Sequence, residues 1–316
     1  MRDTFIRTLA ACAATRSDVL LITADLGFGV FEDFAARYPR QFLNAGIAEQ
    51  NMTGVAAGAA LEGRCVFTYS IGNFPTGRCL EQIRNDVCYH SANVKIVSVG
   101  GGMSYGPLGM SHHATEDLAI MRSLANMIVL APGDLWEAEG ATRALLHCDG
   151  PAYLRLDKSA APRTNFKEDQ FQIGKARLLR DGGDATLIAA GGILGEVLNA
   201  ADLLERERIE CRVLSMHTLK PVDVDALVEA AVDTACIVTV EEHAVEGGLG
   251  GAVAESLLEA GVAPAAFRRL GLRDTFSSVV GSQSFLRQSY GLDAAAIANS
   301  VRTLRQPARQ GLRSIA

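Results

Sequence analysis

The chain has 316 residues, of which 48% are hydrophobic and 21% are charged, and its formal net charge is −6 at pH 7. This length suits about two domains of ordinary size, and the hydrophobic fraction can fill their cores. The negative charge, with no run of more than two Lys or Arg residues, argues against a nucleic-acid or anionic-membrane surface. No stretch approaches 18 uninterrupted apolar residues, so no transmembrane helix is expected.

Apolar runs alternate with helical stretches in the first half of the chain. Strands are predicted at Val19–Thr23, Cys65–Tyr69, Val94–Val99, Met127–Ala131 and Ala152–Leu156. Helices are predicted at Thr4–Ala14, Ala48–Leu61, Cys79–His90, Glu116–Ser123 and Leu135–His147. Continuous apolar strands interleaved with helices favour an α/β fold, in which helices cover both faces of a mainly parallel sheet.

The composition becomes polar between Asp157 and Gln172. We interpret residues 161–172 as a linker between a first domain, residues 1–160, and a second domain, residues 173–316. The α/β alternation then restarts, with strands at Ala185–Ala190, Glu210–Ser215, Cys236–Val240 and Phe267–Leu270, and helices at Leu194–Arg206, Val222–Ala231, Gly250–Gly261 and Asp293–Arg305. The sequence thus predicts two α/β domains in series.

The seven cysteines form no Cys-x-x-Cys pair, and most lie in apolar segments, as Cys65 does in RCVFTYS. Buried reduced thiols in a cytoplasmic protein explain this distribution. The N-terminal segment has an apolar stretch that Asp3 and Arg7 interrupt. We expect a short amphipathic helix there rather than a signal peptide, and a cytoplasmic location.

The segment QFLNAGIAEQNMTGVAAGAAL, residues 41–61, is the most informative part of the chain. A strand end leads into a helix of small residues with few charges, so another surface is expected to pack closely against it. Glu49 lies in its first turn. Taken alone, an acidic residue there only complements the helix dipole. The apolar helix behind it, however, would place this carboxyl group at the mouth of a dry crevice.

The stretch NAGIAEQNMTGVAAGAA resembles the glutamate segment of the pyrimidine-binding domain in transketolases and deoxyxylulose-phosphate synthases. The resemblance implies thiamine diphosphate as cofactor and a catalytic, cofactor-binding role for Glu49. In that family the glutamate hydrogen-bonds a ring nitrogen of the aminopyrimidine. This bond stabilises the imino tautomer, whose nitrogen removes the proton from the reactive thiazolium carbon. The cofactor carries the carbanion chemistry, and the protein tunes it.

The next block, YSIGNFPTGRCLEQIRND, resembles the family's aromatic segment that packs on the pyrimidine ring. Phe74 is the expected stacking residue, and Tyr69 is its rival. Arg78 and Gln82 follow one helical turn apart as further cofactor-binding candidates. The plain alternative makes Phe74 an ordinary core residue and Arg78 a solvated charge.

The block GGGMSYGPLGMSHHATED places three glycines after a predicted strand, where they would let the backbone approach a ligand closely. Two adjacent histidines follow, and no third ligand with suitable spacing makes them a metal site. The block resembles the family loop whose histidine touches the donor hydroxyl or carbonyl. His112 matches this catalytic histidine, and His113 follows as a second substrate contact. Leu108 and Met110 depart from the Asp and Pro of relatives, and that Asp helps to choose sugar stereochemistry.

Two more segments carry substrate-binding candidates. GPAYLRLDKS resembles the family strand whose terminal Arg binds substrate phosphate, and Lys158 falls at that place with Arg155 nearby. Lysine binds phosphate as a point charge, and a plain lysine at the linker edge is the alternative. TADLGFGVFEDF resembles the family's first βα turn, where Asp25 orients substrate or cofactor. Its GFG lacks the third glycine of a dinucleotide fingerprint, so no nicotinamide site is indicated.

The second half resembles the transketolase C-terminal domain through MHTLKPVDVDAL and VTVEEHAVEGGLGGAVAE. His243 and the glycines after it are expected to serve packing and dimer contacts. In this family a different domain, with Gly-Asp-Gly followed by Asn, holds the cofactor's diphosphate through Mg²⁺, and this chain contains no Gly-Asp-Gly. The resemblance therefore implies a split enzyme: an N-terminal-type partner subunit holds diphosphate and Mg²⁺, and two copies of each chain form a heterotetramer.

Three functions remain open at this point. The leading one is transfer of a two-carbon ketol unit from a ketose or ketose phosphate to an aldose, with His112 on the donor and Lys158 on an anionic tail. A decarboxylating thiamine-diphosphate enzyme, resembling deoxyxylulose-phosphate synthase or a 2-oxoacid dehydrogenase β subunit, shares the architecture and the glutamate. A non-catalytic scaffold subunit is the third, and the joint presence of Glu49, Phe74 and His112 argues against it.

Overall fold

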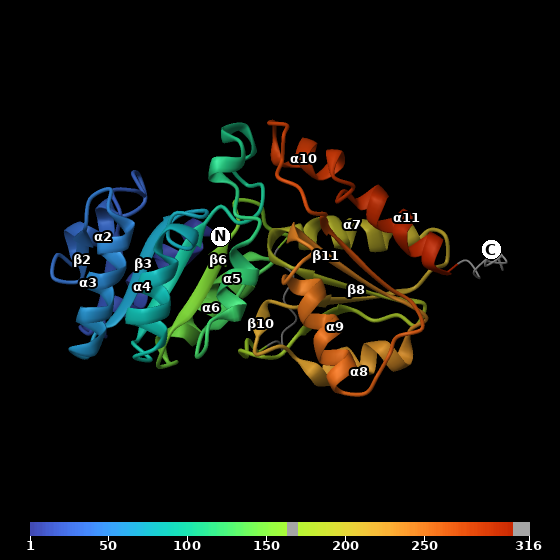
Figure 1. Cartoon of the computed structure of the whole chain (residues 1–316), viewed down its shortest axis with the longest axis horizontal. Coiled ribbons are helices and arrows are strands. Elements are labelled where there is room, and N and C mark those ends of the chain that lie inside the picture. Colours follow the sequence, from blue (N-terminus) through green and yellow to red (C-terminus); the bar gives the residue numbers. More distant parts are fainter. Residues whose placement is uncertain (163–169, 306–316) are drawn as a thin grey trace, which may run out of the picture.

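The computed structural model describes residues 1–162 and 170–305 of the chain. Two α/β units lie side by side along the longest axis of the molecule (Figure 1). Each unit is built on its own mainly parallel sheet with helices on both faces. The fold class predicted from the alternating pattern is confirmed. Most of the predicted linker, at residues 163–169, lies outside the described residues.

The first sheet has seven strands in the order β10-β5-β6-β4-β3-β1-β2. Their bounds are β1 (Val19–Thr23), β2 (Phe42–Asn44), β3 (Cys65–Ile71), β4 (Val94–Val99), β5 (Ile128–Leu130), β6 (Ala152–Leu156) and β10 (Thr218–Lys220). Strands β1 to β6 pair in parallel, whereas β10 runs antiparallel to β5 at the edge. The central strands β3, β4 and β6 are buried almost throughout, which explains their continuous apolar sequences.

Helices cover the two faces of this sheet. Their bounds are α1 (Arg2–Ala13), α2 (Glu32–Arg37), α3 (Glu49–Leu61), α4 (Leu80–Gln82), α5 (Asp117–Ser123) and α6 (Leu135–Leu146), with 3-10 turns η1 (Gly77–Cys79), η3 (Gly106–Leu108) and η4 (Met110–His112). Neighbouring residues of β3 point to opposite faces. Val66 joins a core with Met52 of α3, whereas Phe67 and Tyr69 join the core on the α1 and α6 side.

The single α-helix predicted over Cys79–His90 is wrong. The chain instead passes through the 3-10 turn η1, one α-helical turn and a π-helix, η2 (Ile83–Cys88). A backbone bond between residues five apart, from Tyr89 N–H to Arg84 O at 3.1 Å, belongs to this wider turn. Such π-turns often occur at functional sites, and this one directly follows the segment with the cofactor-binding candidates.

The second sheet has five strands in the order β12-β11-β8-β9-β7, and β7 is antiparallel to β9. Their bounds are β7 (Arg177–Arg180), β8 (Ala185–Ala190), β9 (Cys211–Ser215), β11 (Ile237–Ala244) and β12 (Phe267–Leu272). Helices α7 (Leu194–Glu205) and α11 (Ala294–Arg305) cover one face, and α8 (Val224–Asp233) and α9 (Leu249–Glu259) cover the other (Figure 1). The 3-10 turn η5 (Gly191–Ile193) precedes α7, and α10 (Gln283–Ser289) precedes α11.

Strand β10 joins the two units, which the sequence did not predict. Thr218 and Lys220 pair with Leu130 and Val129 of β5, so a segment from the second half extends the first sheet. Lys220 Nζ also donates to the carbonyl of Arg122 at 3.0 Å. The edge of the first sheet is therefore closed by the second unit. Within residues 1–162 and 170–305, no helix is both long and apolar enough to span a bilayer.

Candidate functional site

The predicted site residues gather at one edge of the first sheet. Because β1 to β6 are parallel, the loops that follow them open at the same carboxyl edge, where α/β sheets bind ligands. The residues that these loops carry are Asp25 after β1, Glu49 after β2, Phe74 after β3, His112 after β4 and Lys158 after β6.

Glu49 is the first residue of α3, and only 3% of it is exposed. Its Oε2 accepts a hydrogen bond from Arg78 Nη1 at 2.7 Å, so a half-exposed guanidinium neutralises a buried carboxylate. The outer face of the helix is open within the described part of the chain, since a Cβ added at Gly54 or Gly58 would meet no atom within 4 Å. The inner face of α3 packs in the core, whereas close packing against its outer face is not supplied by the described residues.

The Arg78 side chain of this ion pair also contacts an aromatic ring. The Arg78 guanidinium lies 4.5 Å from the centroid of the Phe74 ring, and that ring lies edge-on to His112 with centroids 5.4 Å apart. His112 Nδ1 lies 3.1 Å from Ser111 Oγ. An open hollow of about 370 Å³ adjoins these groups, and it is lined by Asn73, Phe74, Gly77, Arg78 and Ser111. The structure thus brings together Glu49, Arg78, Phe74 and His112.

Tyr105 extends this line of side chains to Lys158. The centroid of its ring lies 6.4 Å from that of the His112 ring and 4.6 Å from Lys158 Nζ. Lys158 is exposed at a hollow that Tyr105 also lines. The ammonium group is therefore available to an anion, and one aromatic ring separates it from His112.

Asp25 lies at the same edge but in a different hollow, with Phe28 and Phe31 among its lining residues. Its Oδ1 accepts from Asn44 Nδ2 at 2.9 Å, and its own N–H donates to Asn44 Oδ1 at 3.0 Å. The φ angle of 53° at Asp25 is a left-handed conformation that Asp tolerates better than most residues. The strand ends β1 and β2 hold this turn in place.

Tyr69 is wrong as a candidate for the cofactor pocket. It is 2% exposed on the face of the sheet opposite α3, with its ring 4.6 Å from Phe31 in an edge-on contact. Burial raises the pKa of its hydroxyl. The alternation of side chains along β3 explains the error, because Tyr69 and the α3 face are separated by the sheet. Of the two rivals, only Phe74 lies beside Arg78.

His113 and Gln82 are less open than predicted. His113 is 3% exposed, burial lowers the pKa of its imidazole, and Nε2 has no hydrogen-bond partner among the described residues. This placement does not support direct contact with substrate. Gln82 is partly buried in α4, and its Oε1 likewise has no partner among the described residues.

Two family models match this chain in successive segments. The family model of the transketolase pyrimidine binding domain matches residues 1–164, and the model of the transketolase C-terminal domain matches residues 174–297. The first match alone covers more than half of the 316 residues. This chain belongs to the transketolase family. The family predicted from the Glu49, Phe74 and His112 segments is confirmed.

Similar proteins include subunits of transketolases. One subunit of the apulose-4-phosphate transketolase of Phocaeicola vulgatus is 38% identical over 298 residues, which cover 94% of each chain. A 6-deoxy-6-sulfo-D-fructose transketolase subunit of a Clostridium species is 38% identical over 298 residues, 94% of this chain and 92% of the relative. A solved structure, described as a split gene transketolase in an inactive β4 tetramer, superposes with a TM-score of 0.88 at 38% identity, covering 96% of this chain and 97% of that one.

The glycine-rich loop of this transketolase-family chain packs against its own buried side chains, which corrects the expectation that the glycines face a ligand. A Cβ at Gly101 would lie 1.9 Å from Arg155 Nε and 2.0 Å from Asp157 Oδ1. A Cβ at Gly100 would lie 2.1 Å from the Tyr105 ring. The glycines therefore make room for protein groups, and one of these groups is the ring between His112 and Lys158.

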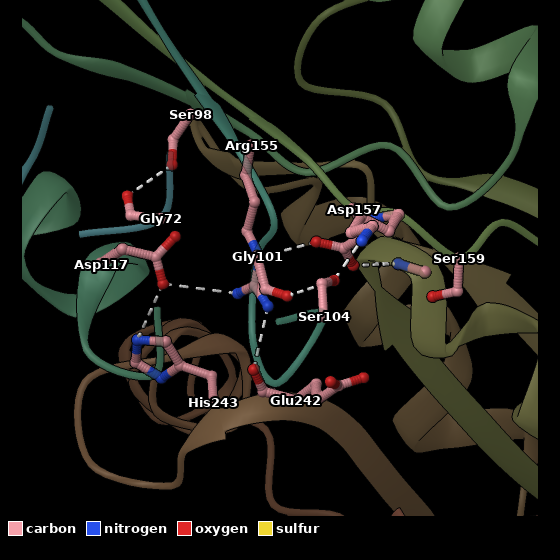
Figure 2. A network of polar contacts seen from close by, with 12 residues as sticks. Gly72, Ser98, Gly101, Ser104, Asp117, Arg155, Asp157, Ser159, Glu242 and His243 are labelled. Carbon is pink, nitrogen blue, oxygen red and sulfur yellow. Dashed lines mark hydrogen bonds and ion pairs between the residues drawn. The ribbon is translucent and has the colours of Figure 1, made fainter. Parts of the chain in front are cut away.

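Arg155 lies at the centre of a buried polar network, as Figure 2 shows. It is 1% exposed; its Nε donates to Asp157 Oδ1 at 3.2 Å and its Nη2 to the carbonyl of Glu242 at 2.9 Å. Its Nη1 lies 3.5 Å from Asp117 Oδ1. Burial opposes the charge, but the carboxylates of Asp117 and Asp157 outweigh it and raise the pKa of Arg155. Arg155 is thus occupied within the protein, and of the two cations considered for substrate at this strand end only Lys158 is exposed.

His243 lies in the same buried region (Figure 2). It is fully buried, its Nδ1 lies 2.7 Å from the carbonyl of Ala244, and its Nε2 lies 3.9 Å from Asp117 Oδ1. The packing role predicted for it agrees with this position. Sequence reasoning missed Tyr105, although the glycine at position 100 and the position of Tyr105 ahead of the two histidines were visible signals.

Proposed function

We propose that this chain is the pyrimidine-binding subunit of a split thiamine-diphosphate transketolase that moves a two-carbon ketol unit from a ketose to an aldose. The observation that carries this proposal is the buried Glu49 carboxylate beside Arg78 and Phe74 at an open hollow. Thiamine diphosphate, when bound, supplies the carbanion chemistry that breaks and forms the carbon–carbon bond. The residues of this chain bind, orient and move protons.

Phe74 and Arg78, which line the hollow, together with Glu49, which pairs with Arg78, and Gln82, one helical turn after Arg78, fit the pyrimidine end of this cofactor. Glu49 offers a buried carboxyl group for a ring nitrogen, and Phe74 offers a flat apolar face to a planar ring. Gln82 adds a buried oxygen that has no partner among the described residues and suits an amino group. Arg78 fixes the Glu49 carboxylate in place. These four residues would hold the pyrimidine ring, and the Glu49 carboxyl group would hold a proton at the ring nitrogen.

The remaining candidates face the sugar. His112, with its ring beside Phe74, would donate a hydrogen bond to the hydroxyl or carbonyl of the donor. Lys158 would pair with an anionic tail. The two similar subunits are named for substrates with a phosphate or a sulfonate, which supports an anionic substrate class here. Asp25, in its own hollow, would orient a substrate hydroxyl.

The diphosphate and Mg²⁺ are assigned to a partner chain of the N-terminal type, with Gly-Asp-Gly followed by Asn. Three observations support a partner: the chain has no Gly-Asp-Gly, the α3 face at Gly54 and Gly58 is open within the described residues, and similar chains are named as subunits. A two-plus-two heterotetramer would place each site between unlike chains. We place this complex in the cytoplasm.

The decisive experiment reconstitutes the two chains with thiamine diphosphate and Mg²⁺ and compares wild type with Glu49→Gln. Loss of a proton-holding group costs roughly 10²- to 10⁴-fold in rate, so ketol transfer should fall by at least about a hundredfold. Glu62→Gln, at the exposed far end of α3, is the matched control. Undiminished transfer in Glu49→Gln would favour the scaffold role, and turnover of pyruvate without ketol transfer would favour a decarboxylating enzyme.

A further inference from the structure

The His112 loop is closed at its base by its own backbone. Gly102 and Ala114 exchange two hydrogen bonds, each 2.9 Å long, and the residues between them carry Tyr105, His112 and His113. These residues form two short 3-10 turns, η3 and η4, and no longer helix or strand. Because the loop has little regular structure of its own, contacts with other elements decide where His112 lies.

One carboxylate of the second unit holds the first residue of this loop. Glu242, near the end of β11, is 1% exposed, and its Oε1 accepts the N–H of Met103 at 2.7 Å. The same carboxylate accepts from Gln283 Nε2 at 2.9 Å and from Arg287 Nε at 2.9 Å. Glu242 therefore joins the loop to helix α10 through buried, charge-assisted hydrogen bonds, which are stronger than neutral ones.

Further contacts follow along the loop. Gln283 Nε2 also donates to Ser104 Oγ at 3.3 Å, and Gly281 N–H lies 3.5 Å from the carbonyl of Gly106. A Cβ at Gly102 would lie 2.7 Å from Glu242 Cγ. In Figure 1 the segment that contains η3 and η4 rises beside the chain that leads into α10. The loop is thus shaped along several residues to fit the second unit.

We propose that Glu242 is a positioning residue for ketol transfer, because it fixes the loop that presents His112. Its buried carboxylate accepts from Met103 and from side chains of α10, so it would act through the loop rather than by contact with cofactor or substrate. The inference rests on the proposed function for its kinetic part, and it gives the C-terminal domain a task in the reaction. A group held in its productive place before substrate arrives contributes through orientation, and a small displacement is costly.

The first test needs no catalysis. Hydrogen exchange of the chain alone is compared among wild type, Glu242→Gln and Glu241→Gln. Glu241 is the matched control, since it is the adjacent, fully buried carboxylate but accepts the N–H groups of Leu249 and Gly250 at the start of α9. Amides of residues 103–113 should exchange at least about tenfold faster in Glu242→Gln only, as one buried hydrogen bond at the base is weakened. Unchanged exchange there, or equal acceleration in both variants, overturns the proposal.

The second test is a double-mutant cycle in the reconstituted complex. Glu242→Gln should lower kcat/KM by roughly 10- to 100-fold, the cost of a misplaced catalytic contact. In the His112→Ala background the same change should have almost no further effect, because both act through one contact. A full multiplicative loss in that background overturns the positioning role. If Glu242→Gln does not fold, Gln283→Ala takes its place in the cycle. This variant removes a half-buried donor to the same carboxylate and should show the same pattern with a smaller effect.

The experiments distinguish failure of the proposed function from failure of the positioning role of Glu242. If the wild-type complex binds thiamine diphosphate but transfers no ketol unit from any donor tried, the proposed function is wrong while the exchange result on residues 103–113 still decides whether Glu242 holds the loop. If ketol transfer is normal but insensitive to Glu242→Gln, the positioning role is wrong and the function stands.

Discussion

Arg78 Nη1 lies 2.7 Å from Glu49 Oε2, and the two partners differ sharply in exposure, with side chains 46% and 3% exposed. The same guanidinium lies over the Phe74 ring. Arg78 therefore connects the buried carboxylate with the aromatic face of the hollow. Without it, the buried Glu49 side chain would lose its ion-pair partner, which is costlier than the loss of a surface pair.

Arg78→Met should weaken the response of the reconstituted enzyme to its cofactor. A hydrogen bond to a charged group contributes about 1.5–3 kcal/mol, and the half-exposed arginine places the effect at the lower end, about tenfold in the cofactor concentration for half-maximal activity. Arg78→Lys keeps the charge but not the flat guanidinium. Its half-maximal cofactor concentration should therefore lie between those of wild type and Arg78→Met. Titration of cofactor-dependent activity measures this, with the exposed Arg84→Met as control. Equal curves for all four proteins would contradict the role of the ion pair.

The part of the site predicted from sequence was the part encoded in short segments. Glu49 at a helix start and Phe74 after a strand are fixed by local structure, so a motif of fewer than 20 residues was enough to place them. Tyr69 was a plausible rival only while the face of β3 was unknown. The strand register, which depends on pairing with distant strands, decided between the two rings.

Two of the errors concern contacts between segments far apart in the chain. The glycines after β4 were expected to face a ligand, but Gly101 lies against Arg155 and Asp157, more than 50 residues later. Strand β10 was missed because its three residues become a strand only by pairing with β5 of the other unit. Tertiary partners of this kind leave no periodic signal in the sequence.

Lys158→Met tests whether Lys158 pairs with a negatively charged group of the substrate. If the ammonium group pairs with an anionic tail, KM should rise up to about fivefold for a phosphorylated or sulfonated ketose and stay unchanged for its neutral analogue, since one solvated charge pair is lost. Initial rates with matched charged and neutral donors measure this. Lys175→Met, an exposed lysine of the second unit paired with Asp223 and Asp225, is the control. A similar rise for both donors would argue against an anion-binding role.

Arg155→Met should destabilise the chain more than most single substitutions. The buried guanidinium compensates Asp117 and Asp157, and removal of one member of a buried charge network costs about 3–5 kcal/mol. Urea denaturation measures the change in the free energy of unfolding. Arg143→Met removes an exposed pair with Glu139 on α6 and should cost less than about 0.5 kcal/mol. Comparable losses for the two variants would mean that the network in Figure 2 contributes little.

The buried Glu137 is expected to make the free energy of unfolding depend on pH. This fully buried residue of α6 accepts from Gly133 N–H at 2.7 Å and from Ser215 Oγ at 3.0 Å, which joins the two units. Burial, and then the neighbouring Asp134 carboxylate, raise the pKa of Glu137 to about 7. In the unfolded chain a glutamate titrates near its ordinary value of about 4.3. Between these values the folded state binds more protons than the unfolded state, so this contribution to stability is complete below about pH 4.3 and is lost as pH rises towards 7.

The Glu137→Gln substitution should remove this loss of stability with rising pH. The free energy of unfolding of the variant, minus that of wild type, should rise by about 3 kcal/mol between pH 4.5 and pH 7.5, since each unit of pKa difference corresponds to about 1.4 kcal/mol. His217 has the opposite sign, because burial lowers the pKa of its imidazole to about 3 and stability falls as pH drops below its ordinary value. Its contribution is present in both proteins and cancels in the difference. Urea denaturation at pH 4.5, 5.5, 6.5 and 7.5 measures the profile, with the exposed Glu205→Gln as control. Parallel profiles for Glu137→Gln and wild type would show that the buried carboxyl group does not titrate in this range.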